Sequence, residues 1–285
     1  MLIKKYYRKL YRAWLGKPLS IDEFEYVIKE LLGISKGDSV LVHCSYGNLK
    51  ADFSPKEAVK VLMEAVGDEG NLLMPYYPED SKNWLEQGKV FDVRSTPTRS
   101  GILSATFALF PEVKKSLHPI KSLAVWGKDR DYLISTHHES VTPFDEKSPY
   151  YLLSHLSGSK TVGLGSYKNS FVHCAEDIDP NYPKYYSNYS LDGRCLDDFG
   201  NAHVVQTYFH AGEKVPRFTG YLINTNCPNY QILKHRMRLF YIGSCKSIMK
   251  HISSNSKNGL YPTEYKENSS LDKRISDIIK YKLNG

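Results

Sequence analysis

The sequence predicts an α/β fold with a mixed, largely parallel central sheet that is flanked by helices. One observation is a strand–helix–strand unit, in which apolar segments at 39–44 and 71–74 enclose a helical segment that begins at Pro55. Another is an apolar strand at 161–164 that a glycine turn joins to a helical run. After Pro180 this alternation stops, and short segments predict additional antiparallel strands in the C-terminal third.

Length and composition describe an ordinary globular chain. Its 285 residues suffice for one large domain, and 41% apolar with 24% charged residues is typical of a soluble protein. The cysteine count is odd and no CxxC pair occurs, which predicts reduced thiols in a cytoplasmic protein. No apolar run approaches the ~18 residues of a membrane span. The five cysteines are Cys44, Cys174, Cys195, Cys227 and Cys245.

The net charge of +7 is concentrated at the N-terminus. Of 38 basic residues, six fall in the first twenty positions without any acid, which leaves 32 against 31 acids in the rest. The body of the chain is therefore a poor candidate for nucleic-acid binding. Residues 1–17 carry apolar side chains at helical spacing, with the basic ones opposite. We expect a helix that lies on an anionic membrane surface, packs on its own core, or joins a second subunit in a homodimer.

The first half of the chain carries clear helix and strand signals. Ser20 and Glu23 form a capping-box pattern, which predicts a helix over 21–32. The segment 76–100 lacks periodicity and predicts a long loop, of the kind that often carries function over an α/β sheet. Further expected elements are a strand at 123–126 and helices at 101–110, 129–136 and 150–156.

The C-terminal third has weaker signals. Asp192 and Gly193 predict a hairpin turn, with short strands near 202–209 and 238–242. A helix followed by a loop is expected over 248–258. The tail at 269–283 again shows helical spacing.

The stretch 158–179 holds the strongest candidate site. If the run after Ser170 is helical, His173 and Glu176 lie at i and i+3 on one face. A carboxylate beside an imidazole fixes its tautomer and raises its basicity, as a general base requires. A solvated surface pair is the alternative. The position after a strand and a glycine turn favours a site, because α/β folds place their sites there.

Six blocks of the sequence carry a family pattern in order. They include a strand that leaves through His43 and Ser45, a Met-Pro strand end, a His118-Pro119 turn, and the block that ends in His173 and Glu176. Together they resemble the aminoglycoside 3-N-acetyltransferase family over about residues 21–250. The blocks are 37–45, 70–75, 91–101, 116–127, 148–149 and 169–176.

The resemblance implies direct transfer of an acetyl group from acetyl-CoA to the amine of an amino sugar. It implies that His173 is the base, that Glu176 orients it or holds the ammonium, and that His118 faces the reaction centre or the coenzyme. Hydroxyls or backbone N–H groups would stabilise the oxyanion. It also implies one acetyltransferase domain at 21–265, between a basic helix at 1–20 and a helical tail at 266–285.

The same resemblance assigns two groups of binding residues. The plainer alternative is turn chemistry for Asp92 and Thr96, packing under the sheet for His118, and solvated charge for Asp177 and Asp179. Expected at the coenzyme are His43, Ser45, Thr96 and Ser122. Expected at the acceptor are Asp92, Ser170, Asp177 and Asp179.

Several positions depart from the family pattern and leave the acceptor open. They are Tyr46, Ala108, Lys115 and Ser170. An aminoglycoside antibiotic and a nucleotide-linked amino sugar for surface polysaccharide are the two acceptors considered. Two other classes remain open, namely an inactive membrane-surface adaptor and a metal-dependent hydrolase that uses the same His and Glu. No closed set of metal ligands is visible. Cys174 is no partner for His173, because helix neighbours point apart.

Overall fold

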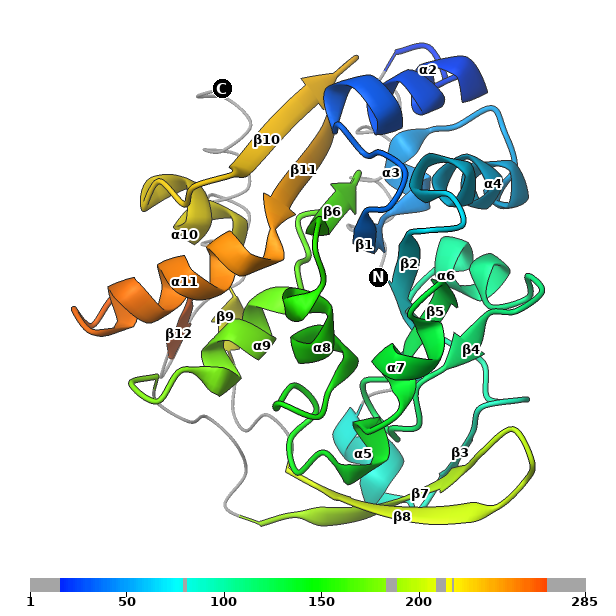
Figure 1. The fold of residues 1–285 in the computed structure, drawn as a ribbon, viewed down its shortest axis with the longest axis vertical. Coiled ribbons are helices and arrows are strands. Elements are labelled where there is room, and N and C mark those ends of the chain that lie inside the picture. The colour runs from blue at the N-terminus through cyan, green and yellow to red at the C-terminus, as the bar shows by residue number, and fades with distance from the viewer. Residues whose placement is uncertain (1–15, 79–80, 183–188, 209–213, 217, 266–285) are drawn as a thin grey trace, which may run out of the picture.

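The structure, a computed structural model, describes residues 16–78, 81–182, 189–208, 214–216 and 218–265. Its centre is a seven-stranded mixed sheet in the order β10-β11-β6-β1-β2-β5-β4 (Figure 1). The predicted mixed α/β fold is thereby confirmed. Strands β6, β1 and β2 are parallel, while β11 and β5 join them antiparallel on either side. The parallel part is smaller than the sequence suggested, because β5 runs against β2.

The parallel core forms where the sequence predicted it. Strand β1 (Ser39–Cys44) and strand β2 (Asn71–Pro75) are buried throughout except for the half-buried end of β1. Helix α4 (Pro55–Val66) connects them and starts with a complete Ser54–Glu57 capping box. The predicted Ser20–Glu23 box also forms at helix α2 (Ile21–Tyr26), which continues as one π-helical turn, η1 (Val27–Leu31).

Helices cover both faces of the sheet (Figure 1). Alternate residues of β1 show this, because Val40 and Val42 pack with α4 on one face while Leu41 packs on the other. The second face is covered by α8 (Pro149–His155), α9 (Phe171–Ile178) and α11 (Cys245–Ser256). The apolar side chains packed on these two faces hold the strands whose ends carry the candidate site.

Two predictions in the loop regions are wrong. The segment 76–100 is not one loop, because it contains α5 (Ser81–Glu86) and β3 (Val90–Asp92). Strand β3 pairs with a distant partner, which local periodicity cannot reveal. Asp192 and Gly193 do not form a turn but lie inside β7 (Leu191–Leu196). The turn falls at Asp197–Asn201, whose backbone hydrogen bonds connect β7 to β8 (Ala202–Thr207).

The remaining strands belong to the antiparallel parts. Strand β6 (Ser159–Leu164) pairs with β11 (Arg238–Ser244), and β10 (Tyr230–His235) forms the sheet edge beyond it. Strand β5 (Leu123–Gly127) carries β4 (Lys114–Lys115) at the other edge. Strands β3, β7 and β8 form a separate three-stranded sheet, and β9 (Lys214–Pro216) pairs with β12 (Thr263–Tyr265).

Five short helices complete the described chain. The predicted helices after 101 and 129 form as α6 (Ile102–Phe107) and α7 (Arg130–Ile134), somewhat shorter than expected. The other three were not predicted from the sequence. These three are α3 (Tyr46–Leu49), the 3-10 turn η2 (His137–Glu139) and α10 (Phe218–Asn224).

Two expectations fall outside the described residues. They are the basic helix at 1–17, apart from its last two residues, and the helical tail at 269–283. The membrane and homodimer roles of the first helix therefore stay predictions. No helix among the described residues is long and apolar enough to cross a membrane.

Candidate active site

The candidate site is built at the carboxyl ends of β1 and β6. These parallel strands run side by side to their ends, with His43 opposite Gly163 and Cys44 opposite Leu164. The chain then turns at Gly165, whose φ of +62° suits glycine, and Asn48 donates a hydrogen bond to its carbonyl. This turn brings the start of α9 over the end of β1. Carboxyl ends of parallel strands are where α/β folds place their sites.

His173 and Glu176 form the pair that their spacing predicted. Nδ1 of His173 lies 3.0 Å from Oε2 of Glu176, and the glutamate is 3% exposed. Thr263 on β12 donates to the other carboxylate oxygen. With Glu176 accepting from both partners, Nδ1 of His173 carries the proton and a neutral ring has its lone pair on Nε2. Phe144 packs against the imidazole, with ring centroids 5.3 Å apart.

His43 contacts Ser170, the N-cap residue of α9. Its Nε2 accepts the backbone N–H of Ser170 at 2.9 Å and lies 2.7 Å from the Ser170 hydroxyl. Its Nδ1 lies 3.3 Å from the hydroxyl of Tyr241 on β11. Burial, then the charges of Lys168 and His173, lowers the pKa of His43 to about 3. The ring is therefore neutral at all physiological pH values.

Tyr77 and Tyr150 also reach Ser170. The hydroxyls of Tyr77 and Tyr150 lie 2.6 Å apart. Burial raises the pKa of both phenols, while hydrogen bonding to Ser170 opposes that shift. The structure thus brings together four hydrogen-bonding side chains around α9 that the sequence did not connect. Tyr77, Tyr150, Tyr241 and Thr263 are separated by long stretches of chain and match no local motif.

His118 and Ser122 lie in the interior of the protein. Both are fully buried, and the Ser122 hydroxyl donates to the carbonyl of Ser116 at 2.6 Å. His118 stacks on His137 with centroids 4.4 Å apart, and its Nδ1 accepts backbone N–H groups of Ile120 and Lys121 at 3.4 Å each. Burial lowers the pKa of His118 well below its ordinary value. Its Nε2 finds no partner among the described residues.

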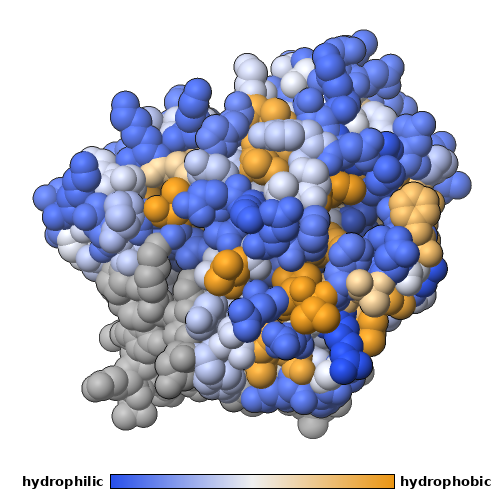
Figure 2. Space-filling view, turned by 60° about the horizontal axis from the view of Figure 1, so that its bottom comes forward, coloured by the Kyte–Doolittle hydropathy of each residue, from blue (hydrophilic) through white to orange (hydrophobic). Residues whose placement is uncertain are grey.

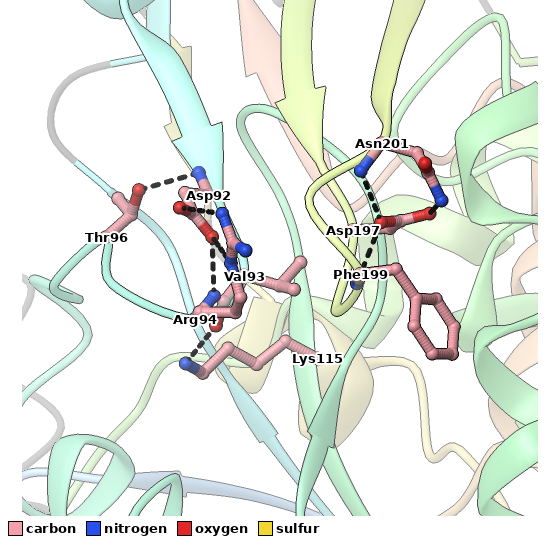
Figure 3. Close-up of polar contacts among 8 residues, drawn as sticks. All are labelled: Asp92, Val93, Arg94, Thr96, Lys115, Asp197, Phe199 and Asn201. Carbon is pink, nitrogen blue, oxygen red and sulfur yellow. Dashed lines mark hydrogen bonds and ion pairs between the residues drawn. The ribbon is translucent and has the colours of Figure 1, made fainter.

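Asp92 and Thr96 form a closed turn after β3 (Figure 3). The Thr96 hydroxyl accepts the Asp92 backbone N–H at 2.8 Å, and Arg94 holds both carboxylate oxygens at 2.9 Å. The Arg94 side chain, through these hydrogen bonds, holds the pKa of Asp92 well below its ordinary value. The geometry matches the turn chemistry considered as the alternative for these residues.

The other two acids also have protein partners. Asp177 accepts the hydroxyl of Thr142. Asp179 is 2% exposed and accepts both the backbone and the side-chain N–H of Asn181. Ser45 differs from these groups, because it lies half-buried at the end of β1 and makes no capping hydrogen bond to α3.

The cysteines are free thiols, as expected. Burial raises the pKa of Cys174 well above its ordinary value and that of Cys195 to about 12, so neither is a thiolate nucleophile at neutral pH. Within the described residues, no three His, Cys, Asp or Glu side chains are placed to hold a metal ion.

A separate open hollow of about 220 Å³ lies between β3, β4 and the β7–β8 turn. The Lys115 ammonium donates to the Val93 carbonyl beside it, and Asp197 is used by the backbone N–H groups of Phe199 and Asn201 (Figure 3). Figure 2 turns this end of the molecule forward and shows small apolar patches separated by polar side chains. None of the residues that line this hollow belongs to the group formed by His43, Ser170, His173 and Glu176.

The fold and the site define an α/β protein with a His–Glu pair at the ends of its parallel strands. The family model for aminoglycoside 3-N-acetyltransferase matches residues 41–251. The chain belongs to that family, as its motifs indicated.

Individual relatives agree with this assignment. Aminoglycoside N(3)-acetyltransferase IV from Salmonella sp. is 30% identical over 149 residues, which cover 51% of this chain and 54% of that protein. The chain spans about half the length of the curated relatives it matches.

Solved structures show the same fold. The crystal structure of aminoglycoside acetyltransferase AAC(3)-Xa superposes with a TM-score of 0.73 at 18% identity, covering 90% of this chain and 99% of that one. A binary structure of AAC-IIIb with CoASH gives a TM-score of 0.71 at 16% identity, with coverage of 89% and 100%.

Proposed function

We propose that this chain is an acetyl-CoA-dependent N-acetyltransferase that acetylates an amine of an amino sugar. The observation that carries the proposal is the His173–Glu176 pair on α9, in which Glu176 also accepts a hydrogen bond from Thr263 of β12. Family membership over residues 41–251 supports the reaction class. The CoASH in the similarly folded AAC-IIIb supports the acetyl donor. In this proposal the family domain at 21–265 is the catalytic unit.

His173 serves as the general base. A sugar amine is largely an ammonium ion near neutral pH and must lose a proton before its nitrogen attacks a thioester. Nε2 of His173 takes that proton, while Nδ1–H donates to Glu176. Glu176 then stabilises the imidazolium that forms. When the C–S bond of the thioester breaks, CoA leaves as its thiolate, and the imidazolium can return the proton to it. The orientation of Glu176 itself depends on the hydrogen bond from Thr263.

Most of the candidate coenzyme-binding side chains already have hydrogen-bond partners within the protein. His43, Thr96 and Ser122 each use their side chain within the protein. We therefore assign these three, and the fully buried His118, to holding the loops around the site. Ser45 remains the candidate for direct contact with the coenzyme, because its side chain lies half-buried at the strand end.

The acceptor is proposed at the level of an amino sugar. The family match favours an aminoglycoside. The internal partners of Asp92, Asp177 and Asp179 favour an acceptor with fewer positive charges, such as a nucleotide-linked amino sugar. The described residues offer no metal-ligand set on which to base a hydrolase.

The test of this proposal is the variant His173→Gln. Removing the base should lower kcat for thiol release from acetyl-CoA by about 10²–10⁴-fold, while acetyl-CoA binding by calorimetry stays within threefold. His155→Gln is the matched control, since His155 is exposed on α8 and should leave both values unchanged. Turnover of His173→Gln within tenfold of the wild type would remove His173 as the base.

A further inference from the structure

The N-cap of α9 is unusual in how it uses its hydroxyl. An N-cap serine normally accepts a hydrogen bond from the N–H two or three residues later. Ser170 makes no such bond, although Ser20, Ser54, Ser148 and Ser244 all do in their own helices. Its hydroxyl lies instead against Nε2 of His43 at 2.7 Å. The Ser170 carbonyl meanwhile accepts the backbone N–H of His173 at 3.1 Å. The placement of Ser170 therefore bears directly on His173.

This arrangement requires one tautomer of His43. A backbone N–H can only donate, so Nε2 must accept from Ser170 and carries no hydrogen. The backbone N–H alone makes this nitrogen the acceptor, whichever way the Ser170 hydroxyl points. In the neutral ring the remaining proton is then on Nδ1, where it faces the Tyr241 hydroxyl. With the other tautomer, two hydrogens would meet at Nε2 and Ser170 would have to move.

Tyr241 is placed to select that tautomer. Its hydroxyl donates to the carbonyl of Lys168, so its oxygen is left to accept from Nδ1–H of His43. The phenol is fully buried and lies tightly over Gly163 of β6, where an added Cβ would come 2.0 Å from the ring. The ring therefore cannot move closer to β6, and the glycine at 163 makes this close approach feasible.

We propose that Tyr241 is a positioning residue for His173, which acts by fixing His43 in its Nδ1–H tautomer and, with the Lys168 carbonyl, the loop 168–170. The role of His173 in this statement rests on the proposed function. The tautomer of His43 does not, because it follows from the hydrogen bonds alone. A residue that only fills the core would contribute stability but would not set a ring tautomer.

The test is the variant Tyr241→Phe, which keeps the ring over Gly163 and removes the hydroxyl. We expect kcat to fall about tenfold, as for loss of one orienting hydrogen bond, with the KM for acetyl-CoA unchanged within twofold. ¹⁵N NMR of the imidazole should show His43 protonated at Nδ1 in the wild type and a shifted tautomer population in the variant. Tyr221→Phe is the control, because Tyr221 also donates its hydroxyl to a backbone carbonyl, that of Leu260, and should alter neither readout.

The two readouts separate this inference from the proposed function. Either an unchanged His43 tautomer in folded Tyr241→Phe or a kcat within twofold of the wild type overturns the positioning role. If the wild type transfers no acetyl group, the proposed function fails, and the NMR comparison alone decides whether Tyr241 sets the His43 tautomer.

Discussion

At the scale of single residues, the proposed base depends on side chains that lie far from it in sequence. Glu176 is nearly completely buried, and a buried carboxylate without donors would be costly. Thr263 and His173 both donate to it, so each oxygen has a partner. The pair can therefore stay ordered through a proton transfer to Nε2. Thr263 comes 87 residues after Glu176, and no sequence spacing would have linked them.

Buried neutral histidines make the stability of the fold pH-dependent. Burial lowers the pKa of both His43 and His137 to about 3, from an ordinary value of 6.5. Below pH 6.5 these histidines bind protons in the unfolded chain but stay neutral in the folded protein until the pH nears 3. Their contribution to stability is therefore intact above pH 6.5 and is lost as the pH falls from about 6.5 toward 3.

We expect the free energy of unfolding to drop by about 2 kcal/mol for each of these two histidines between pH 7 and pH 5. Urea titrations at several pH values would measure it. His137→Gln should flatten the dependence, whereas His155→Gln, at an exposed position, should not. Equal slopes for the wild type and His137→Gln would show that the buried ring does not account for the loss.

At the scale of elements, the sequence correctly predicted helices and strands that are stabilised by contacts between neighbouring residues. The capping boxes at Ser20 and Ser54, the strand at 39–44 and the helix after Ser170 all form where the sequence placed them. Strand β3 was missed, because it pairs with a partner about 100 residues away. Of the β7–β8 hairpin, the strand near 202–209 was predicted and forms, but its turn lies at Asp197–Asn201 and not at Asp192–Gly193.

The candidate site shows the same difference between contacts within one element and contacts between distant parts of the chain. The spacing of His173 and Glu176 predicted their contact, because both lie on one helix. The burial of Ser122 and the Arg94–Asp92 pair were not predictable in the same way, since they depend on which groups the tertiary fold brings near. Tyr241 reaches His43 only because β11 pairs antiparallel to β6, which the sequence did not specify.

The capping box of α4 offers a test at this scale. Ser54 and Glu57 satisfy each other's backbone N–H groups at the start of the helix that joins β1 to β2. Ser54→Ala should lower the free energy of unfolding by about 1 kcal/mol without changing catalysis. Lys56→Ala, on the exposed side of the same turn, serves as the control. A loss no larger than that of the control would mean that α4 is held by its apolar face alone.

At the scale of the whole molecule, the sheet topology explains why the site is where it is. The three parallel strands end together, and their connections bring α3, α9 and the 76–78 segment to one edge (Figure 1). The antiparallel strands β11 and β5 enclose this parallel core on either side. The fold thus concentrates the hydrogen-bonding side chains at one end of a buried sheet.

The measurement that tests the account most directly is thiol release from acetyl-CoA against a panel of acceptors, with the product checked by mass spectrometry for an added N-acetyl group. The panel should hold several aminoglycosides and several nucleotide-linked amino sugars, with the same sugars lacking the amine as controls. We predict release with at least one amine-bearing sugar and none with its amine-free counterpart. Release that is independent of the amine, or a failure to bind acetyl-CoA at all, would contradict the proposed acetyl transfer.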